Sequence, residues 1–155
     1  MVKQPFYGGY GLIAAGGIPK PAFNAFALLH KLGEQRLALT SEDALVTRRK
    51  DGMLVIAAWN IGTPGAAGAE KEIEFKFEHA RVSKMGVTRL DPDHGDIHKA
   101  YQAMGSPRYP SKTQLEKLRT AAELSSQETH QVKNGSVALK IPCQGLVLVE
   151  VKTAR

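Results

Sequence analysis

The sequence predicts a mainly β fold: a β-sandwich with short helical insertions, preceded by a single strand–helix (βα) unit. Residues 1–34 are rich in glycine, alanine and aromatic residues and contain one strong helix pattern. Residues 35–155 consist mainly of short apolar runs separated by turn signals, a spacing typical of a β-sandwich. The length of 155 residues and the hydrophobic content of 43% are ordinary for one folded domain.

The first unit is expected to be a strand, a glycine loop and a helix. Residues 7–15 form either a short buried strand or a turn that leads into one, and Gly16-Gly17 ends it. Pro19 and Pro21 indicate a helix start, because the first helical turn does not need the N–H that proline lacks. We expect the helix to reach Leu32 and to present an apolar face made of Ala22, Phe23, Phe26, Ala27 and Leu29. A single βα unit cannot bury both of its sides and needs neighbours.

The rest of the chain alternates between strand patterns and turns. Apolar or alternating runs predict strands at 44–47, 53–60, 72–78, 82–90, 127–133, 137–141 and 146–151. Lys50-Asp51-Gly52 predicts a hairpin, and Asn134-Gly135 predicts a tight turn between the strands on either side of it. Strict alternation in the third strand places Ile73, Phe75 and Phe77 toward a core.

A helical insertion is expected between the strands. Residues 91–96 form a polar turn, and residues 97–104 a short helix that Gly105 stops. Ser111 and Gln114 predict a capping box at the start of a second helix, Lys112–Leu124.

The insertion begins with the densest set of metal-ligand side chains in the sequence, at 91, 93, 94, 96 and 98. A calcium loop is excluded, because Gly95, Asp96 and Gln102 occupy its fifth, sixth and twelfth positions. His94 and His98 have a spacing that suits zinc on a helix, but Gly95 places His94 in a loop. We favour a polar turn in which Asp96 caps the next helix, and we expect neither a metal nor a cofactor.

No pattern in the sequence predicts a catalytic pair. The glutamates of residues 72–78 lie on the solvent face of an alternating strand. Cys143 has only His130 nearby in sequence and is interpreted as a buried, inert thiol. Phe6, Tyr7 and Tyr10 are either sugar-stacking or core residues, and their residue types do not separate these alternatives.

Net charge and hydropathy indicate whether the protein binds nucleic acid or a membrane, and in which cellular compartment it is expected. The net charge of +6 is spread along the chain and does not indicate a nucleic-acid binder. Apolar runs are much shorter than the ~20 residues of a membrane helix, so we expect no membrane partner. The first residues carry no apolar secretory segment, which favours a cytoplasmic location.

Several blocks together resemble glycoside hydrolase family 39, which contains β-xylosidases and α-L-iduronidases. The blocks are FYGGYGLI at 6–13, GIPKPAFNAF at 17–26, LHKLG at 29–33, VTRLD at 87–91 with HGD at 94–96, MGSP at 104–107 with YP at 109–110, and IPCQGLVLVE at 141–150. The resemblance implies a (β/α)8 barrel followed by a β-sandwich accessory domain. Residues 1–34 would then be the remnant of the last βα unit of the barrel, and residues 35–155 the sandwich.

The resemblance also implies a retaining hydrolysis of terminal β-xylosyl residues, with a xylo-oligosaccharide or related glycoside as substrate. The two catalytic glutamates of such enzymes, about 5 Å apart, would precede this segment, so the chain is expected to be inactive alone. Active sites of this fold lie at the C-terminal ends of the barrel strands. Tyr7, Gly9 and Tyr10 are therefore the candidate substrate-binding residues, at the rim of the site.

The alternative is a free-standing carbohydrate-binding or interaction module with a β-sandwich fold. Aromatic residues make up only 6% of the chain, and two of them, Phe75 and Phe77, are predicted to be buried. Without a barrel, Phe23, Phe26 and Leu29 lose partners for one face of their helix. We expect them either to fold back on the sandwich or to mediate formation of a homo-oligomer.

Overall fold

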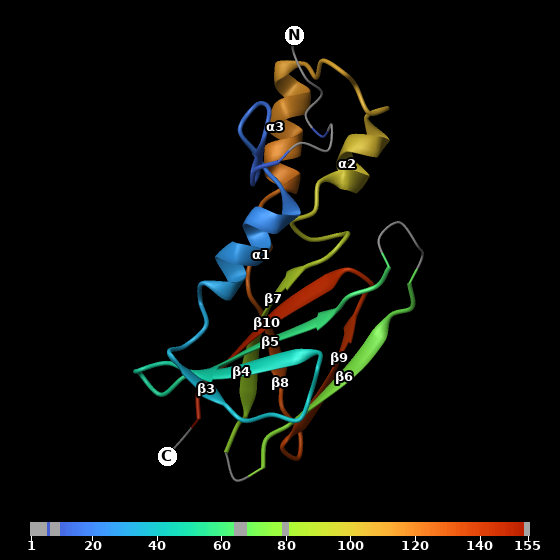
Figure 1. Cartoon of the computed structure of the whole chain (residues 1–155). Coiled ribbons are helices and arrows are strands. Elements are labelled where there is room, and N and C mark those ends of the chain that lie inside the picture. The colour runs from blue at the N-terminus through green and yellow to red at the C-terminus, as the bar shows by residue number, and fades with distance from the viewer. Residues whose placement is uncertain (1–5, 7–9, 64–67, 79–80, 154–155) are drawn as a thin grey trace.

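The computed structural model describes residues 6, 10–63, 68–78 and 81–153 (Figure 1). The fold is mainly β, and no helix in the described part is long and apolar enough to cross a membrane. The elements are β1 (Ile13–Ala14), β2 (Ile18–Pro19), α1 (Pro21–Leu29), β3 (Gln35–Leu37), β4 (Ala44–Arg48), β5 (Leu54–Asn60), β6 (Lys71–Lys76), β7 (Lys84–Leu90), α2 (His98–Ala103), α3 (Lys112–Ala121), β8 (Glu128–Gln131), β9 (Ser136–Ile141) and β10 (Gly145–Val151).

A six-stranded antiparallel sheet with the order β3-β4-β5-β10-β7-β8 forms the centre of the molecule. Its middle strands are buried on both faces. On one face α1 covers Val55, Ala57 and Leu148, and on the other the two-stranded β6–β9 sheet covers Ile56, Val147 and Val149. Because both faces are covered here, residues 54–59 of β5 and 145–149 of β10 are continuously apolar in sequence rather than alternating.

The two sheets share a core and a polar link. Ile73, Phe75 and Phe77 pack into this core, as their alternation predicts. Arg89 of β7 donates from Nη1 to the carbonyl of Lys140 on β9 (3.1 Å) and from Nε to Glu128 on β8 (3.2 Å). One guanidinium therefore joins an edge of the large sheet to the small sheet.

The helical insertion forms a separate lobe with the N-terminal segment, at one end of the sheet (Figure 1). Ile18, Ile97 and Leu118 are fully buried in the core of this lobe. The predicted capping box at the start of α3 is confirmed in both of its hydrogen bonds. Arg119 of α3 donates to the carbonyl of Gly16 in the β1–β2 turn. The insertion and the described residues that precede α1 thus form one core.

Helix α1 joins the lobe to the sheet through a polar residue. Asn24 is 5% exposed, and its Nδ2 donates to the carbonyls of Gly95 (2.8 Å) and Ala122 (2.7 Å). The apolar face predicted for this helix is therefore wrong in part. Leu29 packs on the sheet, whereas Phe23 and Phe26 are exposed, the latter by 63%.

The predicted turns are present, but one connects different partners from those expected. The β4–β5 hairpin at Lys50-Asp51-Gly52 is confirmed. Asn134 and Gly135 adopt positive φ angles of 52° and 73°, as a tight turn requires. The strands then diverge, because β8 pairs with β7 and β9 pairs with β6. The turn carries the chain from one sheet to the other instead of closing a hairpin.

The first unit is a short hairpin followed by a helix. β1 pairs antiparallel with β2 across Gly16 and Gly17, which have positive φ angles of 85° and 71°. The helix begins at Pro21 as expected and ends at Leu29, earlier than the predicted Leu32.

We expect Asn24→Ala to lower the free energy of unfolding by about 3 kcal/mol, because it leaves two buried carbonyls without a donor. Urea unfolding followed by circular dichroism measures the change. Gln102→Ala, on the exposed side of α2, is the matched control and should stay within about 0.5 kcal/mol of the parent. Equal effects of the two substitutions would contradict the role assigned to Asn24.

The Glu128 carboxylate makes the stability of the fold depend on pH. Burial raises its pKa, but the hydrogen bond from His130 and the charge of Arg89 outweigh burial and hold the pKa below the ordinary 4.5. A carboxylate with a lowered folded-state pKa stabilises the fold above pH 4.5, and the effect is lost as the pH falls through the folded-state pKa. Glu128→Gln should therefore destabilise the protein near neutral pH, and progressively less in acid. Urea unfolding midpoints of the parent and the variant, measured from neutral to acid pH, give the difference in stability. Glu116→Gln changes an exposed carboxylate on α3 and is the control, for which we expect no pH-dependent difference from the parent.

Candidate functional site

Of the three residues predicted to lie at the rim of the active site, the structure describes one. Tyr7 and Gly9 lie outside the described residues, and Tyr10 is fully exposed. Phe6 packs edge-on against Tyr101 of α2, with ring centroids 4.9 Å apart. Of the two described aromatic residues here, Phe6 is thus a core residue of the helical lobe, and Tyr10 is a surface residue.

The polar turn after β7 consists of local acid–imidazole pairs. Asp91 is buried, and its Oδ1 accepts from the Asp93 amide (2.9 Å) and contacts Nδ1 of His94 (2.8 Å). Asp96 Oδ1 accepts from the His98 amide (2.9 Å) and contacts His98 Nδ1 (2.5 Å). The prediction that Asp96 caps the next helix is wrong, because the N-cap residue of α2 is Ile97, which makes no side-chain cap. Within the described residues, no three histidine, cysteine or acidic side chains gather as a metal site.

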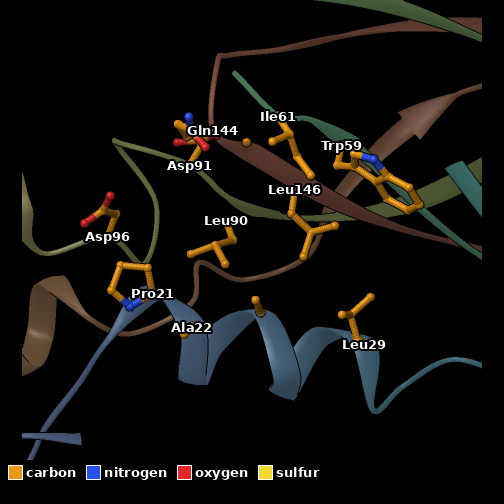
Figure 2. A pocket seen from close by; sticks show the side chains of 12 residues that line it. Pro21, Ala22, Leu29, Trp59, Ile61, Leu90, Asp91, Asp96, Gln144 and Leu146 are labelled. Carbon is orange, nitrogen blue, oxygen red and sulfur yellow. The ribbon is translucent and has the colours of Figure 1, made fainter. Parts of the chain in front are cut away.

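A cavity of about 360 Å³ lies beside this turn, between α1 and the ends of β5, β7 and β10 (Figure 2). Its lining is mainly apolar, with the carboxylates of Asp91 and Asp96 and the amide of Gln144 at one end. The apolar lining comprises Pro21, Ala22, Ala25, Leu29, Trp59, Ile61, Leu90 and Leu146. A concave apolar surface with a few grouped polar atoms is the usual composition of a small-molecule site.

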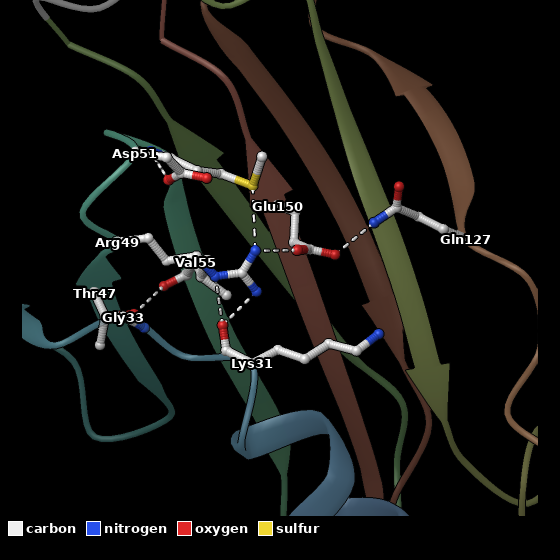
Figure 3. Close-up of polar contacts among 9 residues, drawn as sticks. Lys31, Gly33, Thr47, Arg49, Asp51, Val55, Gln127 and Glu150 are labelled. Carbon is white, nitrogen blue, oxygen red and sulfur yellow. Dashed lines mark hydrogen bonds and ion pairs between the residues drawn. The ribbon is translucent and has the colours of Figure 1, made fainter.

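Helix α1 forms one wall of the cavity, and its C-terminal end is fixed by a polar network (Figure 3). Arg49 donates from Nε to the carbonyl of Lys31 (2.7 Å) and pairs through Nη1 with Glu150 (2.8 Å). Gly33 donates to Thr47 Oγ1 (2.8 Å). With Asn24 holding the other part of the helix, the wall of the cavity is anchored on both sides.

The strand junction at 142–145 shapes the polar end of the cavity. Gln144 has a positive φ of 64°, and its Nε2 donates to the carbonyl of Gly62 (2.9 Å). The thiol of Cys143 lies against Gly62 and Gly68, at positions where a Cβ on either glycine would collide with it. Cys143 is a free thiol as expected, but it is half-buried rather than buried.

The partly buried carboxylates are engaged in structural contacts. Glu150 binds Arg49 and Gln127, and Glu128 binds Arg89 and His130. The pKa is shifted downward at Glu128 and also at Asp93, where the hydrogen bond from Lys99 (2.5 Å) is the main cause. A glycosidase general acid needs the opposite shift. The direction of these pKa shifts disfavours Glu128 and Asp93 as general acids.

Sequence reasoning missed the residues that build the cavity. Trp59 lies in an apolar run whose pattern predicts core residues, and the position of Gln144 before Gly145 predicts only a turn. A signal was present at Asn24, a polar residue inside an otherwise apolar helix pattern, since such a residue needs a buried partner.

Comparison with known proteins decides the family. The sequence profile described as Glycosyl hydrolases family 39 matches residues 1–137. The chain belongs to glycosyl hydrolase family 39. The resemblance drawn from its sequence blocks is thereby confirmed.

Two curated β-xylosidases and a solved structure match most of the chain. The β-xylosidase of Geobacillus stearothermophilus is 31% identical over 157 residues, which cover 99% of this chain and 31% of the relative. The β-xylosidase of Caldicellulosiruptor saccharolyticus is 31% identical over 132 residues, covering 80% and 27%. The crystal structure of a monomeric β-xylosidase from Caulobacter crescentus CB15 has the same fold over 99% of this chain and 34% of that one, with a TM-score of 0.81 at 22% identity. The chain thus spans about a third of the length of its relatives.

We expect Lys99→Met to raise the pKa of Asp93 toward its ordinary value of 3.8, because the substitution removes the hydrogen bond and the charge that lower it. NMR titration of the Asp93 carboxyl carbon measures the shift. Lys117→Met, exposed on α3, is the control and should leave the pKa of Asp93 unchanged. An unchanged Asp93 titration in Lys99→Met would show that this ion pair does not form in solution.

Proposed function

We propose that this chain is the C-terminal part of a retaining, β-xylosidase-like glycoside hydrolase, and that the whole protein removes terminal β-xylosyl residues from xylo-oligosaccharides or related glycosides. The observation that carries the proposal is the match to curated β-xylosidases over 99% of this chain but only 31% of the relative. The hydrolytic residues of the whole protein would then lie in the remaining two thirds. In this proposal the 155-residue chain by itself has no hydrolytic activity.

The same proposal assigns residues 1–34 to the last βα unit of a (β/α)8 barrel and residues 35–155 to a β-sandwich accessory domain. The exposed outer side of α1 supports the first assignment, since Phe23 and Phe26 there have no core to enter. The shared core between the six-stranded and two-stranded sheets supports the second.

Tyr7, Gly9 and Tyr10 remain the proposed substrate-binding residues at the rim of the site. The full exposure of Tyr10 supports this role, because an exposed aromatic ring can stack on the apolar face of a pyranose.

We expect the 155-residue chain to release no aryl alcohol from an aryl β-xyloside above the blank. A rate proportional to chain concentration, and retained through a second purification step, would overturn the assignment of catalysis to another part of the protein.

A chimera tests the family role directly. The segment of the Geobacillus stearothermophilus β-xylosidase that matches this chain is replaced by residues 1–155, and the same enzyme truncated before that segment is the control. We expect the chimera to hydrolyse aryl β-xylosides with retention, read by NMR of the first-formed xylose, and the truncated enzyme to be inactive. A folded chimera that hydrolyses no β-xyloside would contradict the proposal, with circular dichroism and thermal unfolding establishing the fold.

A further inference from the structure

We propose that the cavity between α1 and the ends of β5, β7 and β10 is a binding site for a neutral pyranoside of one or two rings. The choice of a sugar as the ligand rests on the proposed function, whereas the cavity itself is observed, with twelve described residues in its lining. Its volume of about 360 Å³ lies at the lower end of the range of small-molecule sites, about 300–1,000 Å³, which limits the ligand to a short one.

The apolar part of the cavity offers a flat surface and open space. Ala22 and Ala25 of α1 line the cavity with small side chains, which leave open space along this wall. Figure 2 shows Trp59 across the cavity from Leu29, at the opposite end of α1 from Ala22. The Trp59 ring is half-buried, and its indole N–H donates to no acceptor in the described part of the chain. An indole can stack on the C–H face of a saturated ring and donate one hydrogen bond to a ring substituent.

The polar end offers acceptors that are already oriented. Asp91 is 5% exposed, and both contacts that fix it use Oδ1, so Oδ2 has no hydrogen bond among the described residues. The contacts of Asp96 likewise use only Oδ1. Gln144 donates from Nε2 to Gly62, and its Oε1 has no hydrogen bond to any residue that the structure describes. Fixed acceptors lose little conformational entropy when a hydroxyl binds, because they are held before the ligand arrives.

The acidic side chains at this end are held by neighbouring side chains. Asp91 and Asp96 each contact an imidazole, and the neighbouring Asp93 pairs with Lys99. The remaining oxygens, Oδ2 of Asp91 and Oδ2 of Asp96, can each accept a hydrogen bond from a hydroxyl group. A pyranoside supplies adjacent hydroxyl donors and an apolar face together, which matches the two halves of the cavity.

Titration of the full 155-residue chain with methyl β-D-xylopyranoside and with xylobiose tests the site. Trp59 is the only tryptophan, so its fluorescence and its single indole N–H cross-peak report on the cavity directly. We expect a saturable change of both signals. Ala22→Leu should fill the cavity and weaken binding at least tenfold, and Gln144→Ala should weaken it several-fold. Ala103→Leu, an exposed alanine on α2, is the matched control and should change the affinity less than twofold.

Three outcomes would overturn the site: no saturable change with either sugar, binding that Ala22→Leu leaves intact, or saturation by cyclohexylamine in place of the sugars. Circular dichroism of Ala22→Leu excludes loss of fold as the cause of weaker binding. The result is independent of the chimera. Binding here with an inactive chimera would overturn the proposed function alone, and an active chimera without binding here would overturn the site alone.

Discussion

A single buried amide determines how the parts of this molecule fit together. Asn24 lies on α1, the helix that covers one face of the large sheet, and its two N–H groups reach the carbonyl of Gly95 and the carbonyl that follows α3 at Ala122. A helix end leaves its last carbonyls without partners inside the helix, and burying such a carbonyl is costly unless a donor is supplied. The helical lobe can therefore pack against α1 only in the position where Asn24 donates to these carbonyls.

The same constraint sets the dimensions of the cavity. Leu28 and Leu29 hold α1 on the sheet, and Arg49 binds the carbonyl of Lys31 just beyond the helix. With both parts of the helix held, the distance between α1 and the strand ends that line the cavity is fixed. A rigid opening of this kind favours a ligand that fits it without rearrangement.

Local patterns predicted much of this fold, and long-range contacts account for what they missed. The alternation at Ile73 and Phe75 and the Asn134-Gly135 turn depend on neighbouring residues, so the sequence contains the whole signal. The pairing of β9 with β6 instead of β8 depends on which strand lies within reach after collapse. The buried face of α1 was missed because the partners of Asn24 are 71 and 98 residues away.

The candidate site was harder to predict than the fold. The family resemblance could be recognised from short blocks of neighbouring residues. The residues that line the cavity come from α1, β5, β7 and β10, and no pattern among neighbouring residues shows that these elements meet. Phe6 and Tyr10 show the same limit: both are aromatic residues in one glycine-rich segment, yet one packs on Tyr101 and the other is fully exposed.

The contact between Arg119 and Gly16 joins residues 103 positions apart. A ribosome adds roughly 5–20 residues per second, so the β1–β2 hairpin emerges several seconds before the helix that covers it exists. During that interval Ile18 lacks the residues of α2 and α3 that bury it in the finished lobe. Synthesis thus imposes a late closing step on this lobe, after the strands between its two halves have been made.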